Sequence, residues 1–543
     1  MWSRFRECVG RDTRRCRITR SCPVGAALTP MPGFAVPRGT LCPVQTPEAA
    51  PRRGWPAVAV PPWVAGQLAW LLPAAVAAVV VTYRAARPVP WRDEFASWSA
   101  ATRTVPEIVA LGRHIDGVLV PYYLFLHFWI GWFGDSPAAM RAPSMLAMIA
   151  MTAAVAILAT RFRGRAAGLL AGLLTAVLPV VSRYGQEARG YAFAALFATV
   201  ATLAMAAALE RPRWWRWVAY ALCVLLVGLS HLISLLVVAG HLVAVVVAAV
   251  HERRRRPLWG LPAAAAGVGG VLLLTRDGLG QQNAQLNWLS TAQPKILTSV
   301  PELLFLSPIV GGAVFALALF ALHRGQPTPA IVRAVLLWLT VLPPIGLLFA
   351  YDRLVGPIFV GRYLLFAVPL LCVLAGAGLT ALRLPVALVA VLVVGVLGLP
   401  LQSEVRREHS PFDYRAAAAV VGANEEPGDG IVYAPRGGWQ LVDIGLEYYL
   451  RGRAPRDVLL AESETQDASL WATECADPAA CLKGVTRVWV VAADNLDPAF
   501  RADATNQLTA AQRAALRAAY APQRSWRVDG FTITLFAARP APG

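Results

Sequence analysis

The chain has 543 residues, of which 57% are hydrophobic and 15% are charged. This composition excludes an ordinary soluble globular protein and indicates a chain embedded in a membrane. The formal net charge of +18 does not indicate a nucleic-acid-binding protein, because the arginines form short clusters between apolar runs and do not cover one face of a domain. We therefore expect no nucleic-acid partner.

The N-terminal stretch is rich in arginine and proline. It contains no apolar run long enough for the core of a signal peptide. We predict a disordered, basic, cytoplasmic tail over residues 1–55.

Apolar runs recur from residue 60 to residue 402. A bilayer core of ~30 Å needs about 20 apolar residues per helix, and about eleven runs meet this requirement. They lie near residues 63–83, 138–160, 166–182, 190–209, 216–231, 233–250, 258–275, 301–322, 334–350, 362–382 and 385–402. The sequence thus predicts an all-α polytopic membrane part over residues 60–402.

Arginine clusters occupy every second connection between these runs, as the positive-inside rule requires of cytoplasmic loops. With a cytoplasmic N-terminus, the outer face then receives residues 84–137, 183–189, 276–300, 351–361 and all those after 402. The apolar stretch 118–133 would invert this pattern if it crossed the membrane. Its tyrosines and tryptophans suit the headgroup level, so we place it along the outer interface.

The last part of the chain, residues 403–543, has the composition of a soluble domain. Strand-like runs occur at 431–433, 488–492 and 531–536, and a helix-like run at 508–520. We predict a small extracytoplasmic α/β domain. Cys475 and Cys481 flank a short loop, and outside the cytoplasm they could form a disulfide; two unpaired thiols are the alternative.

The first outer loop carries two adjacent carboxylates, Asp93 and Glu94. A carboxylate at this place can accept the proton of an attacking hydroxyl, which is the work of a general base in glycosyl transfer. A solvated pair of loop carboxylates is the alternative. The pair could also coordinate a divalent cation, but no complete ligand set accompanies it. We therefore assign no metal-binding residues and leave a divalent cation open as a cofactor.

Other polar residues gather on the same predicted side. Outward arginines at helix ends break the positive-inside pattern, so Arg141, Arg189 and Arg362 are candidates for holding a lipid phosphate through paired hydrogen bonds. Snorkelling or structural pairing with neighbouring carboxylates is the alternative. The remaining candidates for substrate binding are His114, Asp116, Tyr122, Gln186, Glu187, Tyr191, His231 and Tyr363.

Several short motifs occur together in the predicted membrane part. They are Asp93-Glu94, His114-Ile115-Asp116, Pro121-Tyr122-Tyr123, Arg141-Ala142-Pro143-Ser144 and Gln186-Glu187-Ala188-Arg189-Gly190-Tyr191. This combination resembles the GT-C superfamily. Within it, the chain is similar to bacterial membrane glycosyltransferases of family 39, which are related to protein O-mannosyltransferases and include predicted mannosyltransferases of actinobacteria.

The resemblance implies a GT-C hexosyltransferase, specifically a mannosyltransferase, that uses a polyprenyl-phosphate-linked sugar donor. Asp93 would be the base and Glu94 would orient the acceptor or the base, while Arg141, Arg189 and Arg362 would hold the departing phosphate. The acceptor would be an extracytoplasmic glycan, lipoglycan or protein. We expect a multi-pass protein of the inner (plasma) membrane, surrounded by membrane lipid, with the active site and the C-terminal domain outside the cytoplasm.

The main alternative is a transporter or flippase of a lipid-linked sugar. Such a protein would place ionisable groups near the bilayer midplane, often in repeat-related pairs. Here the predicted helix interiors are mostly Ala, Val and Leu, and the polar groups gather on one side. This distribution favours an outward-facing enzyme.

Overall fold

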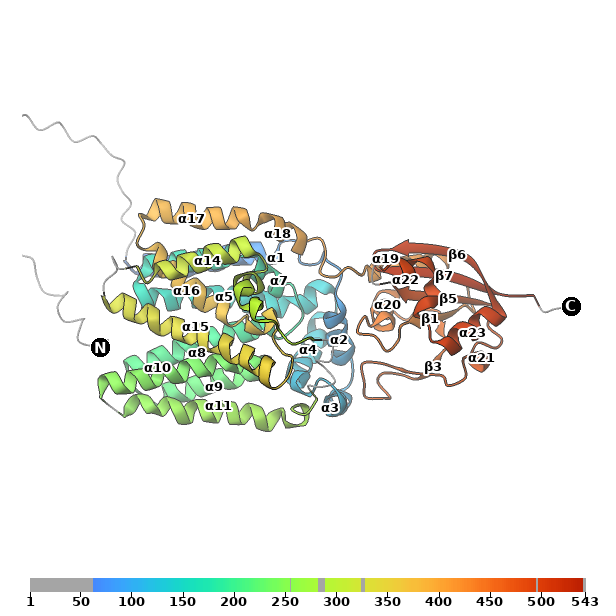
Figure 1. Ribbon diagram of the computed structural model, residues 1–543, viewed down its shortest axis with the longest axis horizontal. Coiled ribbons are helices and arrows are strands. Elements are labelled where there is room, and N and C mark those ends of the chain that lie inside the picture. Colours follow the sequence, from blue (N-terminus) through green and yellow to red (C-terminus); the bar gives the residue numbers. More distant parts are fainter. Residues whose placement is uncertain (1–61, 254, 282–288, 324–327, 495–496, 541–543) are drawn as a thin grey trace, which may run out of the picture. The chain divides into compact units, whose positions relative to one another are not determined.

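Two compact units make up the chain, Met1–Val64 and Ala65–Gly543. The computed structural model describes residues 62–543 except for 254, 282–288, 324–327, 495–496 and 541–543. The tail predicted over residues 1–55 therefore lies outside the described residues. From Ala65 onward, a long helical part is followed by a smaller part that contains both helices and strands (Figure 1).

Each predicted membrane span coincides with a helix or with consecutive helices. These are α1 (Pro62–Thr82), α5 (Pro137–Arg163), α6 (Arg165–Val177) with α7 (Pro179–Gly185), α8 (Tyr191–Glu210), α9 (Trp214–Ser230), α10 (Val237–Glu252), α11 (Gly260–Leu274), α13 (Val300–Phe305) with α14 (Pro308–Phe320), α15 (Thr328–Leu354), α16 (Ala367–Leu379), and α17 (Leu384–Leu397) with α18 (Leu399–Val405). Among the described residues, five helices are long and apolar enough to cross a membrane, and three bent pairs raise the number to eight. Helices α1, α9 and α16 are apolar but shorter, so the count of about eleven spans stays a prediction.

In the first two bent pairs a proline begins the second helix, and in the third pair a proline is its second residue. α6 and α7 meet at 62°, α13 and α14 at 95°, and α17 and α18 at 46°. Leu178 and Ser307, which precede Pro179 and Pro308, have extended backbones. A proline ring clashes with a preceding residue in the helical conformation, and this clash accounts for the first two breaks.

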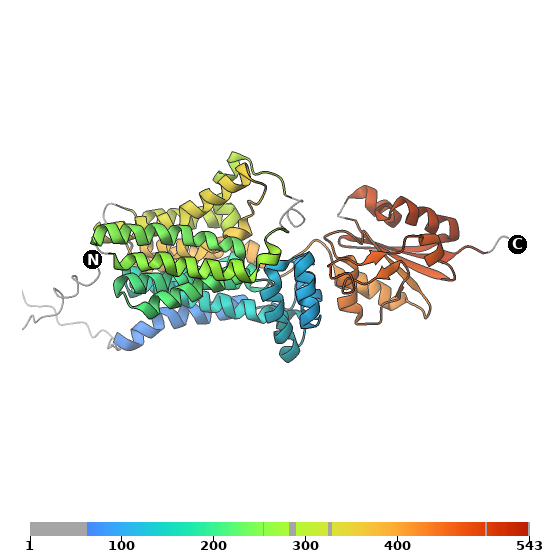
Figure 2. The same ribbon diagram turned by 90° about the horizontal axis from the view of Figure 1, so that it is seen from below.

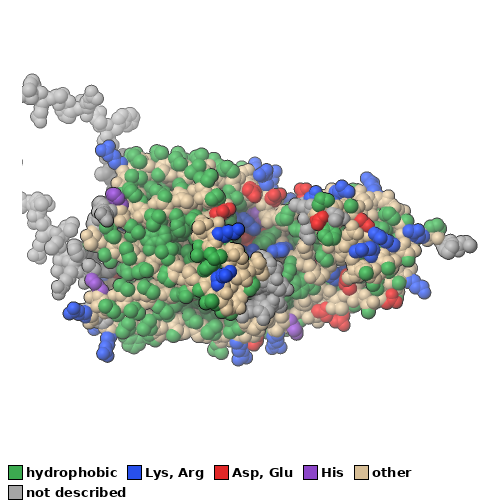
Figure 3. Space-filling view, viewed as in Figure 1, with side chains coloured by type: hydrophobic (Ala, Val, Ile, Leu, Met, Phe, Trp, Pro, Cys, Tyr) green, Lys and Arg blue, Asp and Glu red, His purple; other side chains and the backbone are tan. Residues whose placement is uncertain are grey.

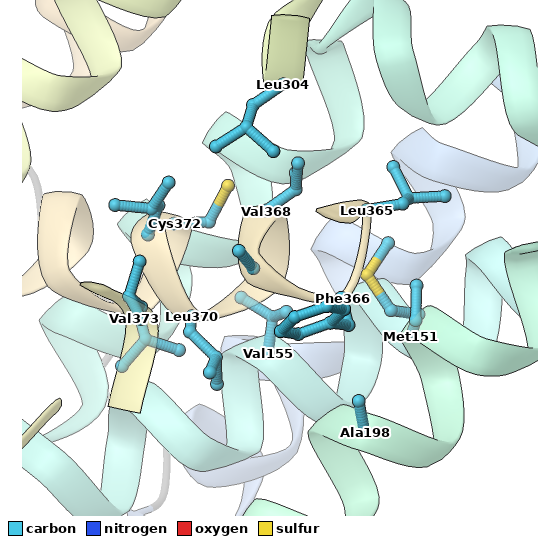
Figure 4. Close-up of a cluster of buried hydrophobic side chains, with 14 of the residues drawn as sticks. Met151, Val155, Ala198, Leu304, Leu365, Phe366, Val368, Leu370, Cys372 and Val373 are labelled. Carbon is cyan, nitrogen blue, oxygen red and sulfur yellow. The ribbon is translucent and has the colours of Figure 1, made fainter. Parts of the chain in front are cut away.

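Helix α16 forms the centre of the helical part. All of its residues are buried, as expected for a helix that is apolar on every side. It packs against α5, α6 and α14, and Figure 4 shows Phe366 and Val368 lying close to Met151 and Val155. This core fixes the helix ends that carry the polar residues described below.

Hydrophobic side chains cover most of the outer surface of the helical part. In Figure 3 they form a broad band, with Lys and Arg gathered at its ends. Leu392, Leu273 and Val250 are each more than 60% exposed. Such exposure is unfavourable in water and natural in lipid, so the helical part is that of a multi-pass membrane protein.

Three short helices follow α1: α2 (Arg92–Ala101), α3 (Val105–His114) and α4 (Val120–Phe133). They run across the end of the bundle and not along it (Figure 2). Trp132 and Phe133 of α4 are exposed, whereas Tyr122 and Tyr123 are buried. An apolar helix with one exposed aromatic end agrees with the interfacial placement expected for residues 118–133.

The C-terminal part contains a five-stranded mixed sheet in the order β2-β1-β5-β7-β6. β1 is parallel to β2 and β5, whereas β7 is antiparallel to β5 and β6. The strands are β1 (Gly430–Ala434), β2 (Arg456–Asp457), β5 (Arg487–Ala493), β6 (Tyr520–Val528) and β7 (Phe531–Ala538); β3 (Leu460–Glu462) and β4 (Thr473–Glu474) form a separate pair. The helices of this part are α19 (Tyr414–Asn424), α20 (Val442–Leu450), α21 (Pro478–Cys481), α22 (Pro498–Ala502) and α23 (Ala510–Ala519).

The sheet buries both faces, as the alternation of side chains along β5 shows. Trp489 and Val491 belong to one hydrophobic cluster, and Val488 and Val490 to the other. The predicted strands and helix match β1, β5, β7 and α23. Strand β6 was missed because it lies at the sheet edge, where most of its side chains are exposed and its apolar alternation is weak. Cys475 and Cys481 form a disulfide.

Candidate active site

A cavity of ≈ 190 Å³ lies where the connections between several helices meet. Its lining combines two carboxylates, three arginines, a histidine and two tyrosines with apolar side chains. Seven of the residues predicted from the sequence line it: Asp93, Asp116, Arg189, Tyr191, His231, Arg362 and Tyr363. These residues are up to 270 positions apart along the chain (363 − 93). The sequence predicted only that they lie on the same side of the membrane, and the fold brings them into one cavity.

Close backbone contacts position two of the walls. A Cβ atom on Gly190 would lie 2.1 Å from the carbonyl oxygen of Ser230. Glycine is therefore required for the turn that carries Arg189 to approach the turn that carries His231. In the same way, Gly117 and Gly278 approach each other so closely that a Cβ on Gly117 would lie 2.6 Å from Gly278 Cα.

Asp352 holds the wall that carries Arg362. One of its carboxylate oxygens accepts hydrogen bonds from the backbone N–H groups of Ile358 and Phe359, at 2.6 and 2.7 Å. The other accepts from the N–H of Ala292 at 2.7 Å. The carboxylate thus orders the loop between α15 and the short helix Gly361–Leu364, and with it the position of Arg362.

Asp93 lies at the edge of the cavity with its side chain 15% exposed. Its Oδ2 is 4.0 Å from a terminal nitrogen of Arg189, and its Oδ1 is 3.7 Å from Nε of Arg92. Both distances are too long for hydrogen bonds. The carboxylate therefore lies beside two cations while its oxygens keep room for a hydroxyl donor.

Arg189 links Asp93 to a second carboxylate. Its guanidinium lies 3.4 Å from the hydroxyl of Tyr123, which donates a 2.6 Å hydrogen bond to Asp116. A further 3.4 Å contact joins Arg189 to Ser97 of α2. Asp116 has a left-handed backbone (φ 58°), which turns the chain from α3 into the cavity wall.

His231 sits between two tyrosine rings. Its ring centroid is 5.2 Å from that of Tyr191 and 5.0 Å from that of Tyr363. Its Nδ1 makes a 2.9 Å hydrogen bond with Ser234 Oγ, which leaves Nε2 as the ring nitrogen available to a ligand. The three rings form a mostly apolar wall with polar edges, suited to a sugar.

Glu94 lies outside the cavity, in a closed cluster. Arg141 donates to both of its oxygens, at 2.8 and 2.7 Å, and also to the carbonyls of Ala85 and Pro88. Both side chains are completely buried. Burial alone would raise the pKa of Glu94, but the charge and hydrogen bonds of Arg141 hold it well below its ordinary value.

This geometry changes the interpretation of Arg141. The sequence-based prediction had it binding the donor phosphate, but its guanidinium is occupied by Glu94 and two carbonyls and has no exposed surface. Its place supports a structural role, in which the pair ties α2 to α5. The same burial argues against Glu94 orienting an acceptor directly. Nδ1 of His409, also buried, lies 3.8 Å from Glu94 and is a residue the sequence analysis did not single out.

The remaining predicted residues surround the cavity without lining it. Gln186 donates hydrogen bonds to the carbonyls of Val81 and Tyr83. Glu187 accepts a 2.6 Å bond from Arg183, and burial raises the pKa of Glu187 to about 7. Tyr122 is buried in a hydrophobic cluster, and His114 is exposed at the end of α3 with Nδ1 3.2 Å from the carbonyl of Ala110. None of these four lines the cavity.

Two polar or aromatic lining residues, Arg92 and Trp439, were missed by the sequence analysis, and Leu441 lies beside Trp439 in the wall. Arg92 precedes the acidic pair and could have been found by the same outer-loop argument. Trp439 and Leu441 come from the C-terminal part, and nothing in their local sequence indicates contact with a site in the helical part. Tyr414 donates to the Gln440 carbonyl and Trp471 to that of Gly438, so this loop is held from both sides.

Among the described residues, no group of three or more His, Cys, Asp or Glu side chains is arranged to hold a metal ion. Asp93 and Asp116 are the two carboxylates of the cavity, and three arginines accompany them. The charge balance of the lining is therefore positive and suits an anionic ligand.

Comparisons with known proteins give a match to one family model and matches to solved structures. Residues 117–276 match the family model of dolichyl-phosphate-mannose-protein mannosyltransferases. The crystal structure of ArnT from Cupriavidus metallidurans in the apo state is similar with a TM-score of 0.55 at 13% identity, covering 86% of this chain and 97% of that one. The structure of the same protein bound to undecaprenyl phosphate gives the same values.

No curated protein matches the chain in sequence. The structural likeness, at 13% identity, establishes the fold, and the family match covers less than a third of the chain. Both agree with the resemblance seen in the short motifs. The chain therefore has the fold of the GT-C superfamily, with a segment similar to the dolichyl-phosphate-mannose-protein mannosyltransferases.

Proposed function

We propose that this protein is a membrane glycosyltransferase that transfers a sugar, with mannose as our first choice, from a polyprenyl-phosphate donor to an acceptor outside the cytoplasm. The observation that carries the proposal is the cavity in which Asp93 lies beside Arg92 and Arg189, with Arg362 also in the wall. A carboxylate base and a group of cations are the two things that this reaction needs.

The arginines suit the phosphate of the donor. When the bond between the sugar and the phosphate breaks, the leaving polyprenyl phosphate gains negative charge, and guanidinium groups stabilise that charge without supplying a proton. Arg189 and Arg362 line the cavity, whereas Arg141 does not. The structure of ArnT bound to undecaprenyl phosphate gives a precedent for such a lipid on this fold.

Asp93 suits the role of base. In the proposed step, the acceptor hydroxyl oxygen forms a bond to the anomeric carbon while the bond from that carbon to the phosphate oxygen breaks. The hydroxyl proton goes to the Asp93 carboxylate, and the electron pair of the broken bond stays on the phosphate. Attack from the face opposite to the phosphate inverts the anomeric carbon, as the resemblance to this family implies.

The other lining residues would bind the sugar and the acceptor. His231, Tyr191 and Tyr363 offer ring surfaces and polar edges to the sugar, and Asp116 offers a carboxylate to its hydroxyls. Trp439 supplies an aromatic surface from the C-terminal part. The proposed acceptor is an extracytoplasmic glycan, lipoglycan or protein. The proposal also includes the orientation of the protein in the plasma membrane, with the cavity on the outer side.

The decisive experiment compares wild type with Asp93→Asn in a transfer assay. Purified protein would be mixed with radiolabelled polyprenyl-phosphomannose and a membrane acceptor extract, and label on the acceptor and on the lipid would be counted. We expect transfer by wild type and a loss of roughly 10²–10⁴-fold in the variant, the usual contribution of a general base.

Asp277→Asn is the matched control, because the side chain of Asp277 is 62% exposed and does not line the cavity. It should transfer label like wild type. If Asp93→Asn keeps full activity, the base assignment is wrong. If no transfer occurs but wild type moves the labelled lipid across liposomes, the flippase alternative replaces the enzyme.

A further inference from the structure

A second groove lies between α9 and α11, away from the catalytic cavity. It has a volume of ≈ 520 Å³ and is lined by residues from the N-terminal ends of both helices and from the connections before them. The two helices lie side by side (Figure 1). A Cβ on Gly267 would lie 2.7 Å from the Ala221 carbonyl, so the helices touch at that level, where the lining of the groove ends.

The groove is apolar along its length and cationic at its mouth. Ala221, Ala263 and Ala266 leave space because their side chains are small. Arg213 and Arg256 belong to the lining, and among the residues that the structure describes no carboxylate does. This combination of an apolar channel and two cations fits a molecule with an acyl chain and an anionic head.

Tryptophans mark the level of the headgroups. Trp214 and Trp259 are 78% and 65% exposed at the mouth, where indole rings favour the boundary between lipid and water. Trp217 also lines the groove and is buried, and its indole N–H has no hydrogen-bond partner among the described residues. The N–H itself is not exposed to the groove, so Trp217 contributes apolar ring surface to the lining.

The groove and the catalytic cavity open at opposite ends of the same two helices. α9 ends next to His231, and the chain after α11 supplies Gly278 to the cavity. The 17 residues of α9 span about 25 Å at 1.5 Å per residue, close to the thickness of a hydrocarbon core. An occupant of the groove therefore sits in the other leaflet from the sugar donor.

We propose that this groove binds one anionic glycerophospholipid of the cytoplasmic leaflet. Its phosphate contacts Arg213 and Arg256, and one acyl chain lies along Ala221, Ala263 and the ring of Trp217. The lipid is a structural ligand that fills the seam between α9 and α11. It is not a substrate of the transfer reaction.

The test is native mass spectrometry of full-length protein released from nanodiscs made of equal parts phosphatidylglycerol and phosphatidylcholine. We expect wild type to retain one phosphatidylglycerol in preference to phosphatidylcholine by roughly thirty-fold, as expected for two cations that each contribute about 1 kcal/mol at a membrane surface. The double variant Arg213→Ala/Arg256→Ala should lose this preference. Ala263→Leu, which fills part of the apolar channel, should retain less lipid of either kind.

The matched control is Arg161→Ala/Arg383→Ala, which removes two arginines from the same predicted side but outside the groove. It should behave like wild type. Equal retention of both lipids by wild type, unchanged preference in the groove variant, or an equal loss in the control would each overturn the proposal. If the double variant does not fold, Ala263→Leu carries the test. Since the readout is lipid binding, it is independent of the transfer reaction.

Discussion

Two adjacent carboxylates at the start of α2 lie in opposite surroundings, one open to the cavity and the other closed. Asp93 faces the cavity, with cations 3.7 and 4.0 Å away and no hydrogen bond from another described residue to its oxygens. Glu94 points into the protein, where Arg141 binds both of its oxygens and nothing is exposed. One residue along a helix is a rotation of about 100°, and this rotation separates a reactive carboxylate from a structural one.

The comparison shows that an ion pair can take part in a reaction or hold the fold together. Which of the two it does depends on whether its hydrogen-bonding capacity is already used up. In the Glu94 cluster the hydrogen-bonding capacity is used up, so the pair holds elements together. Around Asp93 the charges are near each other but not joined by short bonds, so a ligand can enter between them. The predictions below test this contrast, from the largest expected effect to the smallest.

Glu94→Gln should destabilise the protein strongly. The substitution leaves the fully buried guanidinium of Arg141 without its counter-charge, and breaking a buried pair in this way costs about 3–5 kcal/mol. We expect a clearly lower melting temperature in detergent than for wild type, with Asp277→Asn unchanged. A Glu94→Gln protein that melts like wild type but has lost transfer would mean that Glu94 acts in the reaction.

Replacing an arginine by lysine should affect transfer activity in the cavity and melting temperature in the Glu94 cluster. Arg189→Lys keeps a positive charge in the cavity but loses the paired geometry of a guanidinium, so we expect transfer to fall by roughly ten- to hundred-fold with little change in melting temperature. Arg141→Lys should instead lower the melting temperature, because lysine cannot satisfy Glu94 and two carbonyls together. If both variants lose only activity, the closed and open regions are not distinct.

Glu187 should make stability depend on pH. Its pKa is about 7 in the folded protein against an ordinary 4.5, because burial disfavours the charged form. The folded state therefore binds the proton more tightly than the unfolded state, and stability falls as the pH rises from about 4.5 to about 7. Relative to Glu187→Gln, wild type should melt progressively lower across this window and level off above it; an opposite trend would mean that the Arg183 pair dominates.

Trp439→Ala should have the smallest effect. This ring lines the cavity from the C-terminal part, and an aromatic surface of this kind contributes about 1 kcal/mol beyond its burial. We expect the KM for the acceptor to rise by roughly five-fold with kcat nearly unchanged. Trp471→Ala is the informative neighbour, since Trp471 contacts Trp439 and holds its loop without lining the cavity.

The sequence by itself determined the membrane class of the protein and much of its site. Apolar runs of fixed length follow from the thickness of a bilayer, so the helices were found close to their observed ends. The placement of Asp93, Arg189, His231 and Arg362 on one side followed from charge asymmetry between loops. Their meeting in one cavity agrees with that placement.

Only the tertiary structure decided which polar residues line the cavity and which are buried in ion pairs. Asp93 and Glu94 look alike in sequence, and so do Arg141 and Arg189, because local sequence does not record which face of a helix is buried against distant segments. The cavity also takes Trp439 from more than 300 residues away along the chain from Asp93 (439 − 93 = 346). Contacts at such separations come from packing, and packing is fixed by the whole fold and not by any motif.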